Sequence, residues 1–173
     1  AIAILEKTAG LDSPEIAAAL NNLAALYQRQ QRYPEAEPLF RRALAVREKS
    51  LRGDHPDVAQ ALNNLATLYE KLGRHGDSEP LFKRALAIYE KTAGPEHPAV
   101  ATLLNNLGQT GKVQGRYAEA EPRIRRSLAI REKVLGSEHP DVARSLNNLA
   151  DLYERQGRYA EAEPRYRQAL AIW

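Results

Sequence analysis

The sequence predicts an all-α fold, an α-solenoid in which antiparallel helix pairs stack on one another. The tripeptide Asn-Asn-Leu begins at positions 21, 63, 105 and 147, so it recurs every 42 residues. Self-similarity at a fixed period of this length is typical of stacked repeat proteins. Each copy also contains a proline, an apolar pattern of helical period and, in most cases, a glycine, which together indicate where helices begin and end.

The first helix of each repeat is predicted to open with a proline. Proline has a suitable φ for the first turn, and its missing N–H would be unpaired there anyway. In the first copy the apolar positions 20, 23, 24 and 27 then follow the i, i+3, i+4, i+7 spacing of one helix face. A residue suited to a left-handed backbone should end the helix. The prolines are Pro14, Pro56, Pro98 and Pro140, and the terminating residues are Gln31, Gly73, Gly115 and Gly157.

The second helix of each repeat is predicted to begin near Tyr33, His75, Tyr117 and Tyr159. A further proline follows about one turn later in every copy, where it removes a backbone hydrogen bond or bends the helix. We interpret it as a shared kink or a late helix start that shapes the superhelix. These prolines are Pro38, Pro80, Pro122 and Pro164.

The repeats predict a single array over residues 1–173. Both ends of the sequence fall within the same kind of helix and there is no initiating Met, so we expect a fragment of a longer array. The predicted boundaries are 1–10 for the tail of a preceding second helix, 13–52, 55–94 and 97–136 for three full repeats, and 139–173 for a truncated fourth.

Composition excludes several classes of protein. The chain has no Cys, so disulfides, thiol catalysis and Cys-bound metals are excluded. Its longest apolar runs are a few residues, which predicts no membrane span, and no secretory leader is recognisable, which favours a cytoplasmic protein. The 25 basic and 22 acidic residues give a net charge of +3, a mixed surface that argues against nucleic acid as a partner.

No motif for catalysis or cofactor binding is present, and we expect a non-enzyme without a cofactor. The histidines before three of the helix prolines are one repeat apart. Stacked helices lie roughly 8–10 Å apart, too far for the bonds of about 2 Å that His makes to a metal. We therefore expect these histidines at the helix entry, and we assign the recurring acidic residues of the second helix to its dipole. The histidines are His55, His97 and His139; the acidic residues are Glu35, Glu37, Asp77, Glu79, Glu119, Glu121, Glu161 and Glu163.

The motifs Leu-x-x-Leu-Ala-x-x-Tyr, Gly-Arg-Tyr-x-Glu-Ala and Phe-x-x-Ala-Leu resemble the tetratricopeptide repeat, which usually has 34 residues. The segment 127–143 is similar to the 42-residue version found in kinesin light chains and their bacterial relatives. The resemblance covers the whole chain. It implies a right-handed superhelix whose first helices line the concave face, and a protein–protein interaction module that acts as an adaptor or scaffold.

The recurring Asn pair is the candidate binding feature. The second Asn of each pair shares a helix face with residues four before and three and seven after it, which forms a polar stripe across successive helices. An amide both donates and accepts, so it can hold the main chain of an extended peptide. The resemblance likewise implies that the second Asn, and the residue four earlier, contact a peptide. The predicted peptide-binding residues are Asn22, Asn64, Asn106, Asn148, Gln60, Thr102, Arg144, Thr67 and Lys71.

Peptide binding is not the only explanation of this stripe. The Asn pairs could instead form a ladder of hydrogen bonds between neighbouring helices, with no ligand. Animal relatives have a basic groove that favours acidic peptides, whereas Ala18, Gln60 and Thr102 are uncharged here and Asp151 lies nearby, so the resemblance does not by itself imply a preference for acidic peptides.

The second class of function is a structural array that associates end to end, because an uncapped solenoid exposes its core at each terminus. The apolar residues expected at the two ends are Ile2, Ile4 and Leu5, and Ile172 and Trp173. A further expectation concerns the third repeat, where Gly108 and Gly111 replace larger residues. We expect either a neighbour's side chain in the space they leave, or a hinge.

Overall fold

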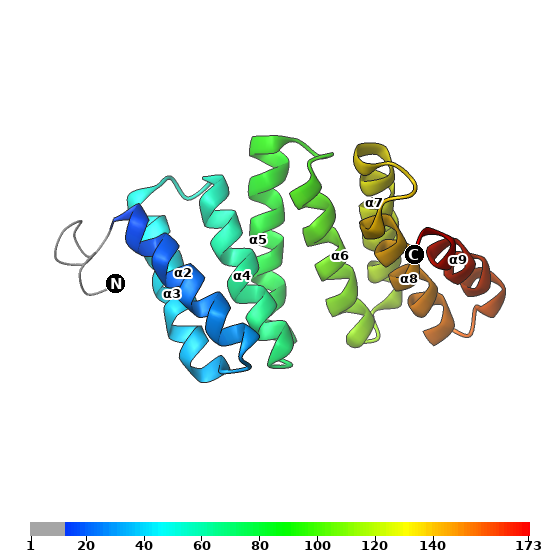
Figure 1. Ribbon diagram of the computed structural model, residues 1–173, viewed down its shortest axis with the longest axis horizontal. Helices are drawn as coiled ribbons and strands as arrows, with labels where there is room; N and C mark the ends of the chain where they lie inside the picture. Colours follow the sequence, from blue (N-terminus) through cyan, green and yellow to red (C-terminus); the bar gives the residue numbers. More distant parts are fainter. Residues whose placement is uncertain (1–12) are drawn as a thin grey trace. The chain divides into compact units, whose positions relative to one another are not determined.

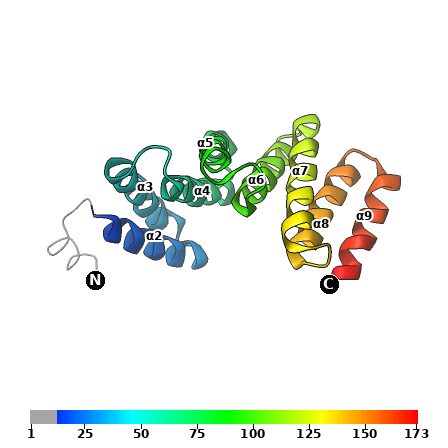
Figure 2. The same cartoon turned by 90° about the horizontal axis from the view of Figure 1, so that it is seen from above.

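The computed structural model describes residues 13–173, and every regular element in this part of the chain is an α-helix. The prediction of an all-α fold is therefore confirmed, as are the helix starts at the 42-residue period (Figures 1 and 2). The helices are α2 (Pro14–Arg29), α3 (Tyr33–Ser50), α4 (Pro56–Lys71), α5 (His75–Ala93), α6 (Pro98–Val113), α7 (Tyr117–Leu135), α8 (Pro140–Arg155) and α9 (Tyr159–Ile172). The predicted tail at 1–10, with Ile2, Ile4 and Leu5, lies outside the described residues.

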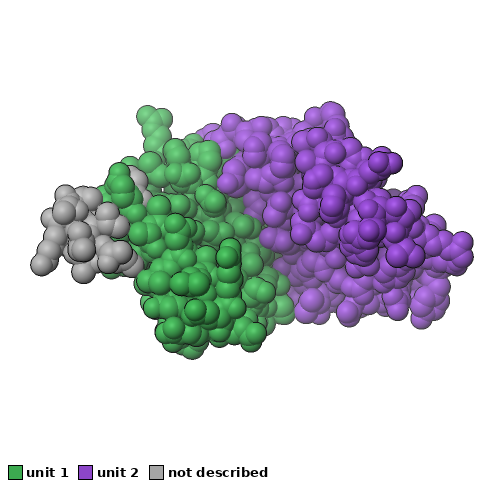
Figure 3. Space-filling view, viewed as in Figure 1, with its two compact units in different colours: residues 1–88 green, residues 89–173 purple. Residues whose placement is uncertain are grey.

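The chain divides into two compact units, Ala1–Ile88 and Tyr89–Trp173 (Figure 3). In the first unit α2 pairs with α3, and α3 packs on α4. In the second unit α6 pairs with α7, α7 packs on α8, and α8 pairs with α9. Each unit therefore contains helix pairs stacked through the second helix of one repeat and the first helix of the next, as the repeat period predicts.

The even-numbered helices begin and end as the sequence predicts. Each starts at its proline and is followed two residues after its last residue by a backbone of positive φ, 60° at Gln31 and between 71° and 74° at the three glycines. Ser13 and the three histidines cap these helices. Ser13 Oγ accepts from the N–H of Ile16, and each histidine Nδ1 accepts from the N–H two residues later, at 3.1–3.2 Å.

The prolines of the odd-numbered helices do not mark a late start. Helix α3 begins at Tyr33 and continues through Pro38 to Ser50, and the other three follow the same pattern. Only one backbone hydrogen bond near the beginning of each helix is lost to the proline. Of the two interpretations of this proline, the late start is excluded.

A separate apolar core lies at each joint. In the first unit Phe40 of α3 and Leu68 of α4 are buried together. In the second unit Ile124 of α7 packs with Leu152 and Tyr153 of α8. The second helix of one repeat is therefore covered by the first helix of the next. This packing fixes the orientation of each first helix within its unit, and with it the direction in which the Asn residues point.

Candidate functional site

The Asn pairs form hydrogen bonds between first helices within each unit. Asn64 Nδ2 on α4 donates to Asn21 Oδ1 on α2 at 2.8 Å. In the second unit Asn148 Nδ2 on α8 donates to Asn105 Oδ1 on α6, also at 2.8 Å. The first Asn of one repeat thus accepts from the second Asn of the next. The ladder of hydrogen bonds between neighbouring helices, which the sequence offered as an alternative to peptide binding, is therefore present in both units.

The remaining polar residues of the stripe in the first unit face solvent. Asn22 and Gln60 are exposed, and neither amide has a hydrogen-bond partner among the described residues. Thr67 is half-buried and its hydroxyl donates to the carbonyl of Asn63 in the same helix. Asn22 and Gln60 therefore keep full hydrogen-bonding capacity for a partner, whereas Asn64 retains its acceptor oxygen and part of its donor capacity.

A shallow hollow continues this face at the carboxyl ends of α2 and α4. Arg29 and Lys71 are both exposed cations, and neither has an ion-pair partner among residues 13–173. Ala25 adds an apolar part to the lining. The hollow is thus a positively charged and partly apolar depression that is accessible to solvent. Its lining residues are Ala25, Gln28, Arg29, Gln31, Tyr33 and Lys71.

The corresponding face of the second unit has different chemistry. Thr102 and Arg144 are exposed, with Arg144 paired to Asp141 at 2.8 Å, and Asn106 and Asn148 are half-buried. Lys112, which is almost fully buried, forms an ion pair with Asp151 of α8. This pair could not be predicted from the repeat pattern, because the residue at this place in the other repeats is Gln28, Glu70 or Glu154.

Asp151 also accepts from Arg155 Nε at 3.0 Å. Burial alone would raise the pKa of Asp151, but the hydrogen bonds and charges of Lys112 and Arg155 outweigh burial and hold that pKa below its usual value. The Asp151 carboxylate is therefore already paired with two cations of its own unit and is not available to a cationic ligand.

A second recurring contact joins the repeats on the other side of the first helices. In the first unit Tyr69 donates its hydroxyl proton to Glu37 of α3 at 3.3 Å, and Arg41 Nε donates to the same hydroxyl at 3.0 Å. Arg74 lies over the Tyr69 ring at 4.2 Å and donates to both oxygens of Glu37. We call this set of four residues, one Tyr, one Glu and two Arg, the tyrosine clasp.

The second unit contains the same clasp. Tyr153 donates to Glu121 at 3.2 Å, while Arg158 donates to Glu121 at 2.6 Å and stacks 4.3 Å from the centre of the Tyr153 ring. Arg125 completes the clasp with a bond of 2.9 Å to Glu121.

The assignment of Glu37 and Glu121 to the helix dipole was therefore wrong. Helix α3 begins at Tyr33, which places Glu35 in its first turn and Glu37 beyond it. Burial would raise the pKa of Glu121, but the hydrogen bonds from Arg158 and Arg125 overcome this and lower it. The clue in the sequence was that Glu and Arg recur at the 42-residue period in all four repeats, and Tyr in three of the four.

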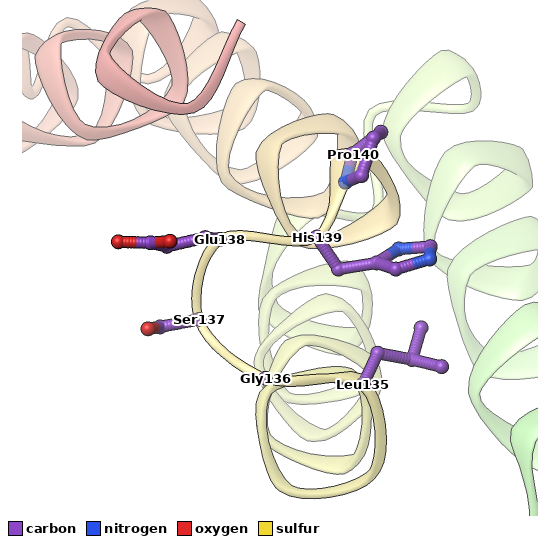
Figure 4. Close-up of a pocket in the computed structure, with 6 residues that line it drawn as sticks. All are labelled: Leu135, Gly136, Ser137, Glu138, His139 and Pro140. Atoms are coloured by element: carbon purple, nitrogen blue, oxygen red, sulfur yellow. The ribbon is translucent and has the colours of Figure 1, made fainter.

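The histidines act as helix caps and do not converge on an ion. No group of three or more His, Asp or Glu side chains suited to a metal was found between residues 13 and 173. A hollow at the α7–α8 linker is formed by Leu135, Gly136, Ser137, Glu138, His139 and Pro140 (Figure 4). In this view His139 points to the same side as Leu135 and away from Ser137 and Glu138, and its Nδ1 already accepts from the N–H of Asp141.

The glycines of the third repeat leave no empty space at the helix contact. A Cβ added at Gly108 would lie 2.4 Å from Ile124 Cγ1, so the Ile124 side chain occupies the space that a larger residue would need. A Cβ at Gly111 would meet only Ala120 Cβ at 3.4 Å and backbone atoms at longer distances. Of the two expectations for this repeat, filling by a neighbour's side chain is confirmed at Gly108.

None of the helices that the structure describes is long and apolar enough to cross a membrane. A search of curated protein sequences found no match to this chain. Solved structures do resemble it. The putative kinesin light chain from Podosopora anserina with nearly identical TPR-like repeats is 31% identical, with a TM-score of 0.81, and the match covers 99% of this chain and 81% of that one.

BtubC (BKLC) from P. vanneervenii is 27% identical, with a TM-score of 0.84; the match covers 92% of this chain, which spans only 64% of the BtubC chain. Aspartyl phosphate phosphatase F from Bacillus subtilis is 18% identical, with a TM-score of 0.79, and 92% of this chain aligns with 40% of it, a likeness of fold alone.

The sequence model of the tetratricopeptide repeat matches residues 15–91, 61–110 and 112–173. These matches cover nearly all of the helices described above, and the structural neighbours include kinesin light chain-like repeat proteins. Repeats of this kind are in general modules for protein–protein interaction. The chain belongs to the tetratricopeptide repeat family.

Proposed function

We propose that this protein binds an extended peptide segment of a partner protein along the exposed polar face of α2 and α4, and that it acts as a non-catalytic adaptor or scaffold. The observation that carries the proposal is a pair of exposed amides, Asn22 and Gln60, which have no hydrogen-bond partner among the described residues and lie on the face that continues into the hollow with Arg29 and Lys71. An amide can pair with either the N–H or the C=O of a peptide main chain.

The ladder supports this proposal by holding the two helices in register. Because Asn64 is tied to Asn21, the first helices are linked on the same face that carries Asn22 and Gln60. Amides presented by a rigid surface lose less conformational entropy on binding than amides on a mobile one. Asn64 can still accept from a peptide N–H through the second lone pair of its carbonyl oxygen.

The hollow gives the peptide a direction. Arg29 and Lys71 would attract a carboxylate of the peptide at the carboxyl ends of α2 and α4, and Ala25 would contact an apolar side chain beside it. In the second unit the corresponding place is occupied by Asp151 and its two bound cations. We therefore assign the attraction for a carboxylate to the first unit and not to the whole array.

A random peptide display library selected against the 173-residue chain tests this proposal. The best peptide, labelled with a fluorophore, is titrated with the native chain and with the Asn22→Ala/Gln60→Ala variant. Losing two hydrogen bonds worth about 1 kcal/mol each should weaken binding about 30-fold. Gln168→Ala, which changes an exposed amide of α9, is the matched control. An unchanged affinity of the double variant would overturn the proposal.

A further inference from the structure

The first helices of each unit are bridged at two levels, and the second level differs between the units. The first level is the Asn–Asn hydrogen bond, which both units contain. The second level lies nearer the carboxyl ends of the helices, where Lys112 of α6 forms an ion pair with Asp151 of α8 in the second unit. In the first unit the same period positions hold Gln28 and Thr67, which are not hydrogen-bonded to each other, and the Thr67 hydroxyl donates to Asn63 in its own helix.

The hollow of the first unit lies at this second level. Gln28 lines the hollow together with Arg29 and Lys71. Its counterpart Lys112 reaches instead from α6 to Asp151 on α8. The second unit therefore has a carboxylate of its own at the level where the first unit is open to solvent.

Two cations hold the Asp151 carboxylate, one on each oxygen. Lys112 Nζ contacts Oδ2, and Arg155 Nε donates to Oδ1 at 3.0 Å. Neither cation has another ion-pair partner among residues 13–173, and Glu154, next to Arg155 in the chain, accepts from the Tyr166 hydroxyl at 2.7 Å. The Lys112 side chain is 7% exposed and that of Asp151 is 30% exposed. The two cations therefore surround a single carboxylate that is reached from solvent on its own side.

This ion pair is a costly way to do no more than join two helices. Taking Lys112 out of water is unfavourable unless an anion compensates its charge, and two apolar side chains of similar volume often stabilise a protein as well as a buried ion pair. The repeat itself does not require an acid at the position of Asp151, because the other three repeats hold Ala25, Thr67 and Gln109 there. What the pair adds to this face is a bound negative charge.

We infer that Lys112 and Arg155 form an anion-binding site in the second unit, and that Asp151 occupies this site as an internal ligand. Asp151 is then a specificity-determining residue for the peptide. An acidic side chain of the peptide meets an anion whose two cations are already engaged, so it is excluded from α6–α8 and accepted at the hollow of the first unit. The role in specificity rests on the proposed function, whereas the anion site does not. The ligand class is a carboxylate, because one carboxylate already bridges both cations.

Asp151→Ala empties the site and should let an external carboxylate enter it. The first repeat has Ala25 at this position, so alanine is compatible with the helix. Formate is the probe, because it is the smallest carboxylate. We expect the thermal midpoint of Asp151→Ala to lie below that of the native chain and to rise as sodium formate replaces sodium chloride at constant ionic strength, as for any ligand that binds only the folded state. If the variant is unfolded in chloride, formate should restore its helical circular dichroism.

Lys112→Met/Asp151→Ala is the matched control, because it removes a cation together with the carboxylate and replaces the buried pair by apolar side chains. It experiences the same general salt effect of formate, so only the additional rise in Asp151→Ala reports binding. The native chain, whose site is filled, should behave like this control. An equal rise in both variants, or no rise and no recovery of helix in Asp151→Ala, would overturn the anion site.

A glutamate scan of the peptide tests the role in specificity. Each position of the peptide selected against the native chain is changed to Glu in turn, and its affinity is measured for the native chain and for Asp151→Ala. We expect at least one position at which Glu favours Asp151→Ala about tenfold, the value of a charge-assisted hydrogen bond, and no such position with Lys112→Met/Asp151→Ala.

A scan that Asp151→Ala leaves unchanged would refute the role in specificity, even where formate binds. A chain that selects no peptide would overturn the proposed function and this role with it. The formate experiment contains no peptide, so it decides the anion site in either case.

Discussion

Asn21 accepts a hydrogen bond of 2.8 Å from Asn64, while its neighbour Asn22 faces solvent and has no partner within residues 13–173. The two residues of the pair therefore have different surroundings although they are adjacent in the sequence. Consecutive helix residues point about 100° apart, so one reaches the neighbouring helix and the other the open face.

This difference predicts different effects on stability. Asn21→Ala removes the acceptor of Asn64 and should lower the free energy of unfolding by about 1 kcal/mol. Asn22→Ala loses no contact, and because Ala is the better helix former the variant should be as stable as the native chain or slightly more stable. Urea unfolding followed by circular dichroism measures both. Equal losses in the two variants would contradict the different surroundings of Asn21 and Asn22.

The ion pair between Lys112 and Asp151 predicts that stability depends on pH at the acid end. The pKa of Asp151 is lowered in the folded unit, so its contribution is present above the ordinary Asp value of about 3.9 and is lost as the pH falls through the folded pKa. Asp151→Asn should cost on the order of 2 kcal/mol at neutral pH, because it leaves the buried Lys112 charge without its counter-ion.

The loss caused by Asp151→Asn should shrink as the pH is lowered below about 4, because Asp151 of the unfolded chain is protonated there first and the native carboxylate follows at its lower pKa. Urea unfolding at a series of pH values measures this convergence. Arg155→Gln is the comparison, because Arg155 is half-exposed and its bond to Asp151 is worth less than about 1 kcal/mol. Stability curves that stay parallel down to pH 2 would show that Asp151 is not the titrating group.

The tyrosine clasp predicts a contrast between two tyrosines at equivalent positions. Tyr153→Phe removes the hydrogen bond to Glu121 in a buried joint and should destabilise the second unit by about 1 kcal/mol. Tyr27→Phe removes a hydroxyl without a described partner and should leave the stability of the monomer unchanged. Thermal unfolding of dilute samples compares the two.

The helices could be predicted from the sequence because their signals are local. A proline at the first turn, an apolar stripe of helical period and a glycine at the end all act within one helix, and α4, α6 and α8 begin and end as these signals indicate. For Gly108 the sequence left filling by a neighbour and a hinge both open; the structure has the Ile124 side chain in that space, in keeping with the dense packing of protein interiors.

The contacts between repeats could be predicted only in part. The period indicated that the Asn pair has a common role, but the choice between ladder and ligand depends on which side chain reaches the next helix, and that requires the helix packing. Glu37 was assigned to the dipole because its partners Tyr69 and Arg74 are more than thirty residues away. Lys112 gave no signal at all, since its pairing with Asp151 occurs once and breaks the repeat pattern.

The two glycines of α6 predict opposite effects of the same substitution. Gly111→Ala adds a methyl group at ordinary contact distance and improves helix propensity, so it should stabilise the second unit by up to about 1 kcal/mol. Gly108→Ala places its Cβ 2.4 Å from Ile124 Cγ1 and should destabilise that unit by about 1–3 kcal/mol through overpacking. A double-mutant cycle identifies the cause: in the Ile124→Ala background, Gly108→Ala should become neutral or stabilising, because the clashing atom is gone. A Gly108→Ala loss that persists in that background would place its origin in the helix backbone and not in the contact with Ile124.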